Sequence, residues 1–152
     1  MNRDQLLKRI DGRWHDFVQA IQGLSDEAIQ EPGVVGDWSV KDLLGHIATW
    51  EEESLAALAL IMDGKRTPRY ARFGGIDAFN VIRWGEHRDQ PGEEVRRRFL
   101  EAHTGLIALL RKAPERFFEE ETRFRRRLRL DTYSHVPEHT EHVLSWREAK
   151  GL

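Results

Sequence analysis

Three histidines with metal-ligand spacing, His135, His139 and His142, fall close together near the end of the chain. On a helix, at about 100° per residue, their rings would form one narrow stripe. Imidazoles four positions apart on a helix can bind one metal ion, and His135 and His139 have that spacing. His139 and His142, three positions apart, form a second candidate pair. The segment therefore predicts two ligands of a metal site, and a further ligand must come from elsewhere.

The histidine stripe also has a simpler interpretation, a hydrated surface in which each ring bonds to water or to a carbonyl group. His46 favours the metal interpretation, because it lies beside Leu43 and Ile47 on the apolar side of another predicted helix. One ion cannot bind the whole stripe, since His135 and His142 would lie about 10.5 Å apart along the helix axis. The residues alone leave open which pair binds.

Helices that could position these side chains follow from the hydrophobic pattern, in which apolar residues recur at helical spacing between Pro- and Gly-rich loops. The expected helices cover residues 4–23, 39–62, 76–87 and 93–112, followed by a connector over 115–121 and a last helix that starts between 131 and 134 and ends at 150. No segment alternates like a strand. We therefore predict an all-α fold, a four-helix bundle with long connecting loops that forms a single domain over residues 1–152.

Two helix starts can be placed more closely. Ser39 and Asp42 resemble a capping box, with Trp38 just before the cap. Pro137 is costly inside a helix but tolerated in the first turn, which favours Ser134 as the cap of the last helix.

Composition narrows the classes of partner. The chain has no cysteine, its charged amino-terminus lacks the apolar run of a signal peptide, and no apolar stretch is long enough to cross a bilayer. These features predict a cytoplasmic protein with no membrane partner. Charged residues make up 33% of the chain, but the net charge is only −2. A basic run over 123–129 follows Glu119, Glu120 and Glu121, which could neutralise it, so we expect an intramolecular or dimer-interface role and no nucleic-acid partner.

Two motifs resemble those of the DinB/YfiT-like superfamily. The segment 38–51 (WSVKDLLGHIATWE) is similar to its second-helix signature, and 135–139 (HVPEH), followed by Trp146, is similar to its terminal histidine pair. Segments 132–135 and 79–80 resemble the DfsB/ClbS branch. The resemblance implies a four-helix bundle, often a homodimer, in which three histidines bind a divalent ion, commonly zinc or nickel. The ligands then fall on His46, His135 and His139, with His142 beside the site.

Three neutral imidazoles and an open position are typical of a catalytic metal site, which can activate water or a thiol. With no cysteine in the chain, a thiol would have to be a cosubstrate. We therefore predict a metal-dependent hydrolase or thiol-dependent transferase acting on a small electrophilic molecule. The alternative is a non-enzymatic bundle that binds or sequesters a small molecule. Glu51 and Glu138 could each act as a base or as a partner of the metal ligands, or could simply face solvent. Trp50 could line the pocket. The 65–75 loop should govern substrate selectivity, since loops beside a rigid scaffold usually do so.

Overall fold

The computed structural model describes residues 1–120 and 122–152. These residues form α-helices, two short 3-10 helices and connecting turns, and they contain no β-strand. Glu121, the last residue of the expected connector, lies outside the described residues. The elements are α1 (Arg3–Ala20), α2 (Asp26–Gln30), α3 (Val40–Met62), η1 (Tyr70–Phe73), α4 (Ile76–His87), α5 (Gly92–Lys112), η2 (Glu115–Phe118), α6 (Arg123–Asp131) and α7 (Val136–Lys150). The all-α prediction is confirmed.

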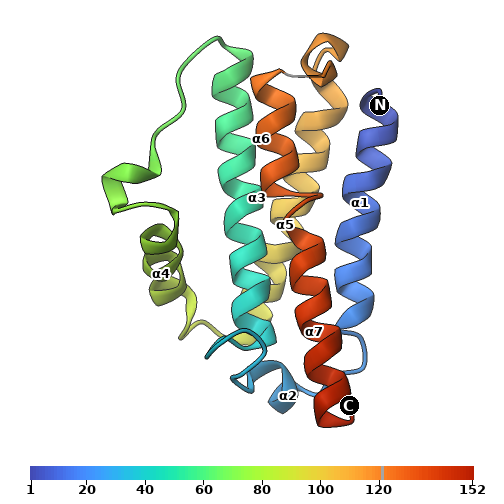
Figure 1. Cartoon of the computed structure of the whole chain (residues 1–152), viewed down its shortest axis with the longest axis vertical. Helices are drawn as coiled ribbons and strands as arrows, with labels where there is room; N and C mark the ends of the chain where they lie inside the picture. The colour runs from blue at the N-terminus through green and yellow to red at the C-terminus, as the bar shows by residue number, and fades with distance from the viewer. Residues whose placement is uncertain (121) are drawn as a thin grey trace.

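Four columns make up the bundle: α1, α3, α5, and a fourth built from α6 and α7 placed end to end (Figure 1). The α3 helix packs against α5 and α6, whereas α7 packs mainly against α1. Helix α4 stands outside the bundle beside α3. The predicted four-helix bundle is therefore confirmed, with one correction: the last column contains two helices and not one.

The break in the fourth column follows from backbone bonding in the turn 132–135. The amide groups of His135 and Val136 both donate to the carbonyl oxygen of Thr132, at 3.0 and 2.8 Å. The amide of Ser134 donates to the carbonyl oxygen of Arg129. These bonds tie the turn back to α6, so α7 begins only at Val136. The prediction that Ser134 caps α7 is wrong, since His135 occupies that position and its side chain makes no capping bond.

The start of α3 is the predicted capping box. The Ser39 hydroxyl accepts a hydrogen bond from the Asp42 amide at 3.1 Å, and the Asp42 carboxylate accepts one from the Ser39 amide at 2.9 Å. This satisfies amide groups that the first helical turn would otherwise leave without partners. The cap fixes the first residue of α3 and so the position of His46 relative to the start of the helix.

Two groups of buried apolar side chains hold the columns together, one around Phe17, Leu44 and Phe99 and the other around Leu58 and Phe124. The first group joins α1, α3, α5 and α7, and the second joins α6 to α1, α3 and α5. Within the described part of the chain, no helix combines the length and apolar character that a membrane crossing requires.

Candidate metal centre

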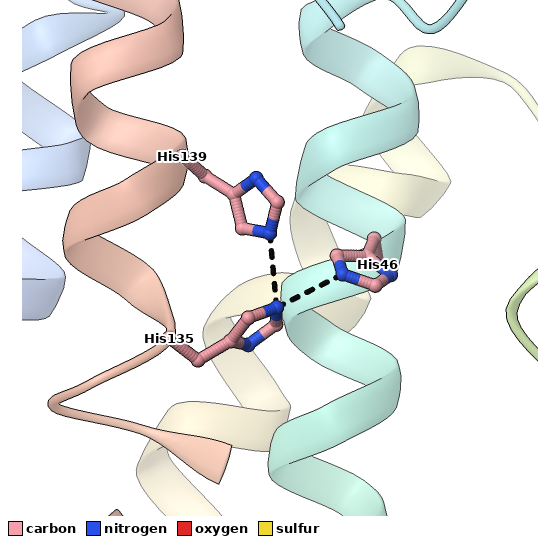
Figure 2. Close-up of side chains that lie close together, drawn as sticks. All are labelled: His46, His135 and His139. Atoms are coloured by element: carbon pink, nitrogen blue, oxygen red, sulfur yellow. Dashed lines mark hydrogen bonds between the residues drawn. The ribbon is translucent and has the colours of Figure 1, made fainter. Parts of the chain in front are cut away.

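The three histidines singled out from the sequence meet between α3 and α7 (Figure 2). The Nε2 atom of His135 lies 3.0 Å from Nε2 of His46 and 2.9 Å from Nε2 of His139. One ring nitrogen from each residue falls within 4.8 Å of the other two. His46 reaches the cluster from α3, His139 from the first turn of α7, and His135 from the turn that precedes it.

Burial keeps these rings uncharged. It lowers the pKa of His46 to about 3, with a smaller contribution from the charge of His135. It also lowers the pKa of His135 and His139, and in His139 the other histidines of the cluster act in the same direction. Neutral imidazole is the form that binds a metal ion, so all three rings are in the ligating form at neutral pH.

The hydrogen-bonding of the rings also fits a cation. A hydrogen bond with the backbone of Asp131 partly opposes the lowered pKa of His135. Nε2 of His135 faces the other two rings, so in the tautomer that carries the proton on Nδ1 its lone pair points into the cluster. Three converging nitrogen donors are a suitable ligand set for zinc or nickel.

Of the neighbouring residues, His142 and Glu138 are exposed and lie outside the cluster. The ring centroid of His142 is 5.6 Å from that of His139. Glu138 acts through its charge, which tends to raise the pKa of His135. The interpretation of Glu51 as a base, a partner of the site or a solvent-facing residue is wrong. Five positions along α3 rotate its side chain about 140° away from His46, where it is buried against His103.

A pocket of about 350 Å³ opens onto two of the clustered histidines, His46 and His135. Trp50 lines it, as the sequence suggested, and Tyr70 reaches it from the 65–75 loop. The remaining lining residues are Ile76, Asn80, Arg127, Leu130 and Asp131. Sequence reasoning missed these five. The sequence does contain one signal for this segment: Arg127 and Asp131 have opposite charges and lie four positions apart, a spacing that favours a helix.

Polar bonds fix the walls of this pocket. The guanidinium of Arg127 donates to the carboxylate of Asp131 and to the hydroxyl of Tyr70. The indole N–H of Trp50 donates to the side-chain oxygen of Asn80 at 2.9 Å. Burial raises the pKa of Asp131 to about 6, although the neighbouring guanidinium acts to lower it. The pocket thus places a guanidinium and a carboxyl group close to the histidine cluster.

The lowered pKa values predict acid sensitivity of the metal-free protein. Below pH 6.5 the unfolded chain takes up protons on His46, His135 and His139, but the folded chain does not, so unfolding is favoured as pH falls. Each group contributes up to about 1.4 kcal/mol per pH unit over the range between its folded pKa and 6.5. Urea unfolding of chelator-treated protein between pH 7 and pH 5 measures this. A His46→Gln variant should lose less stability over that range, and equal losses would contradict the prediction.

Fold and site together define a class: a helical bundle with three histidines clustered beside a pocket of small-molecule size. The chain belongs to the DinB superfamily, whose family model matches residues 9–145. An uncharacterised protein from Escherichia coli UTI89 has a similar structure, with a TM-score of 0.80 at 12% identity, covering 99% of this chain and 95% of that one. No curated protein matches the chain by sequence.

The colibactin self-resistance protein ClbS, solved in complex with double-stranded DNA, is also similar in structure. Its TM-score is 0.75 at 17% identity, with 93% of each chain covered. Our expectation that nucleic acid can be excluded as a partner is therefore wrong. A protein of this fold forms a complex with DNA, so the mixed charge of the present chain is no ground for setting that class of partner aside.

Proposed function

We propose that His46, His135 and His139 bind a divalent zinc or nickel ion and that the chain is a metal-dependent enzyme. The reaction would be hydrolysis or thiol-dependent transfer on a small electrophilic molecule. The observation that carries this proposal is the pocket of about 350 Å³ that opens onto two of the three histidines. That volume lies within the range of pockets that bind small molecules.

Different residues of the pocket would bind the substrate and stabilise charge during the reaction. A bound ion would supply Lewis-acid activation of the nucleophile or of the electrophile. The rings of Trp50 and Tyr70 and the exposed side chain of Leu130 provide an apolar wall for the body of the substrate. The Arg127 guanidinium, held in place by Asp131, can stabilise negative charge that develops on a substrate oxygen.

Asp131 is suited to move a proton in this site. Its carboxyl group lines the pocket, and burial raises its pKa to about 6. It can therefore accept a proton from water or from a thiol cosubstrate near neutral pH and release it again. With Asp131 in this role, the three histidines can stay neutral throughout the reaction.

Metal analysis and turnover test this proposal. Protein purified without a histidine tag is expected to contain one zinc or nickel ion per chain. A panel of esters, epoxides and alkyl halides, the last two with a low-molecular-weight thiol, should include a compound that is turned over only with the ion present. Chelation should abolish that turnover. Metal well below one ion per chain after reconstitution would contradict the metal site.

The non-enzymatic alternative remains a binding or sequestering protein, and the same panel separates it. Stoichiometric binding of a compound in the pocket, without chemical change in either the metal-loaded or the metal-free state, would favour sequestration over catalysis.

We infer double-stranded DNA binding as a second candidate function. It is supported by the structural similarity to ClbS, whose solved structure is a complex with double-stranded DNA, and by the basic sequence of α6. A low-salt titration of the wild-type chain with a DNA duplex tests it, and absence of binding would contradict it.

A further inference from the structure

A second hollow, of about 400 Å³, lies between α1 and a different face of α6 from the one that lines the pocket. At 100° per residue, Arg125, Arg126 and Arg129 fall on one side of α6, whereas Arg127 and Asp131 fall on another. The residues that line this hollow, called here the arginine groove, are Met1, Arg9, Glu120, Arg125, Arg126, Arg129, Tyr133 and Ser134.

Positive charge is concentrated in the arginine groove. Among the described residues that line it, four are arginines and one, Glu120, is a carboxylate, although the whole chain has a net charge of −2. Arg126 has an interaction of its own, so the charges considered below are those of Arg9, Arg125 and Arg129. Gathering like charges is unfavourable unless opposite charges balance them, and Glu120 balances only part of the charge of Arg9, Arg125 and Arg129. The groove is open and polar, which suits a hydrated, charged ligand better than an apolar one.

Two of the arginines are held in position by the fold. Arg125 donates to the carbonyl oxygen of Phe118 at 3.2 Å and lies 3.8 Å from the carboxylate of Glu120. The guanidinium of Arg9 lies over the ring of Tyr133, 5.0 Å from its centroid. Arg129 is exposed and, in the part of the chain that the structure describes, its side chain makes no hydrogen bond or ion pair. Its guanidinium is therefore available to an external anion.

We propose that the arginine groove binds the phosphate groups of double-stranded DNA, an assignment that rests on the second candidate function. Arg125 and Arg129 are separated by a rise of about 6 Å along α6. This is close to the axial advance of two nucleotide steps along one strand, at about 3.4 Å per step. The hydroxyl groups of Tyr133 and Ser134, at the same groove, can donate to phosphate oxygens as well.

The arginine groove is connected to the histidine cluster by consecutive residues of the chain. Tyr133 and Ser134 belong to the turn between α6 and α7, and the next residue is His135. DNA in the groove would therefore contact the turn that carries one of the three clustered histidines. The contacts in this groove are to the backbone, so binding there should not depend on base sequence.

A pair of double variants tests the assignment. Arg9→Ala/Arg129→Ala removes two groove charges, and Arg72→Ala/Arg96→Ala removes two exposed charges from η1 and α5, outside the groove. Helix α1 and η1 lie on opposite sides of the bundle (Figure 1). Fluorescence anisotropy with a 20-base-pair duplex is recorded from 50 to 200 mM salt. We expect the groove variant to bind about 10- to 100-fold more weakly at 50 mM salt, with a salt slope smaller by about 1.8.

The outcomes separate DNA binding by the chain from the assignment of that binding to the arginine groove. A wild-type chain that does not bind the duplex at 50 mM salt overturns DNA binding itself and the groove assignment with it. Wild-type binding that both double variants weaken equally, or that neither weakens, overturns the groove assignment but leaves DNA binding standing. Pyrophosphate that binds the chain when the duplex does not would make the groove a small-anion site and overturn DNA as its occupant. Thermal unfolding of both variants checks that they are folded.

Discussion

Replacement of His46 by alanine is expected to weaken zinc or nickel binding by at least about 100-fold. Loss of a residue that only hydrogen-bonds to a metal ligand costs about 10- to 100-fold in affinity. His46 is itself one of the three histidines that cluster among the described residues, so its loss should cost at least as much. It is also the one donor of the cluster that comes from a helix other than α7 and the turn before it. Without it, His135 and His139 retain the spacing of a two-ligand site, which binds divalent ions more weakly.

Competition with a chromogenic chelator measures this affinity in tag-free protein. His139→Ala should show a similar loss, whereas His142→Ala, which alters an exposed ring outside the cluster, should bind as the wild type does. Unchanged affinity in the His46→Ala variant would remove His46 from the ligand set. A large loss in His142→Ala alone would instead favour the pair formed by His139 and His142.

The second large effect concerns a buried ionic network that joins three columns away from the histidine cluster. Nδ1 of His103, on α5, lies 3.1 Å from both carboxylate oxygens of Glu51 on α3, and its Nε2 lies 2.9 Å from a carboxylate oxygen of Asp11 on α1. The ring also stacks on Trp14, at 4.2 Å between centroids. Burial acts to lower the pKa of His103, but Glu51 and Asp11 outweigh it, and the pKa is raised.

His103→Ala is expected to lower the free energy of unfolding by about 3–5 kcal/mol. Glu51 is only 1% exposed, so removal of its partner leaves a carboxylate buried without compensation. Burial already raises the pKa of Glu51, with His103 as the main opposing influence. Loss of the stacking contact with Trp14 adds to the cost.

Urea unfolding at pH 7 measures the effect, with a double variant as the control. In His103→Leu/Glu51→Leu both charged partners are replaced by apolar side chains, a change that is often neutral or stabilising for a buried ion pair. We therefore expect the double variant to be more stable than His103→Ala. A loss below about 1 kcal/mol in His103→Ala, or a double variant less stable than the single one, would show that the network is not a major source of stability.

Helix positions were largely predictable because they depend on neighbours in the chain. The apolar period and the Ser39–Asp42 cap predicted α3 correctly, since both arise from contacts within a few residues. The same local reasoning failed at Ser134. Its amide bonds to Arg129 in α6, and nothing in the Ser134–Pro137 spacing reports that bond.

The sequence by itself indicated that His135 and His139 fall on one side where the last helix begins, because four residues make about one helical turn. It also indicated His46, through its apolar neighbours and its resemblance to a family motif. Only the tertiary structure decided that the three Nε2 atoms converge and that Glu51 faces His103 and not the cluster. The physical reason is that each helix fixes the relative directions of its own side chains, whereas its rotation against the other columns is set by packing between residues distant in the chain.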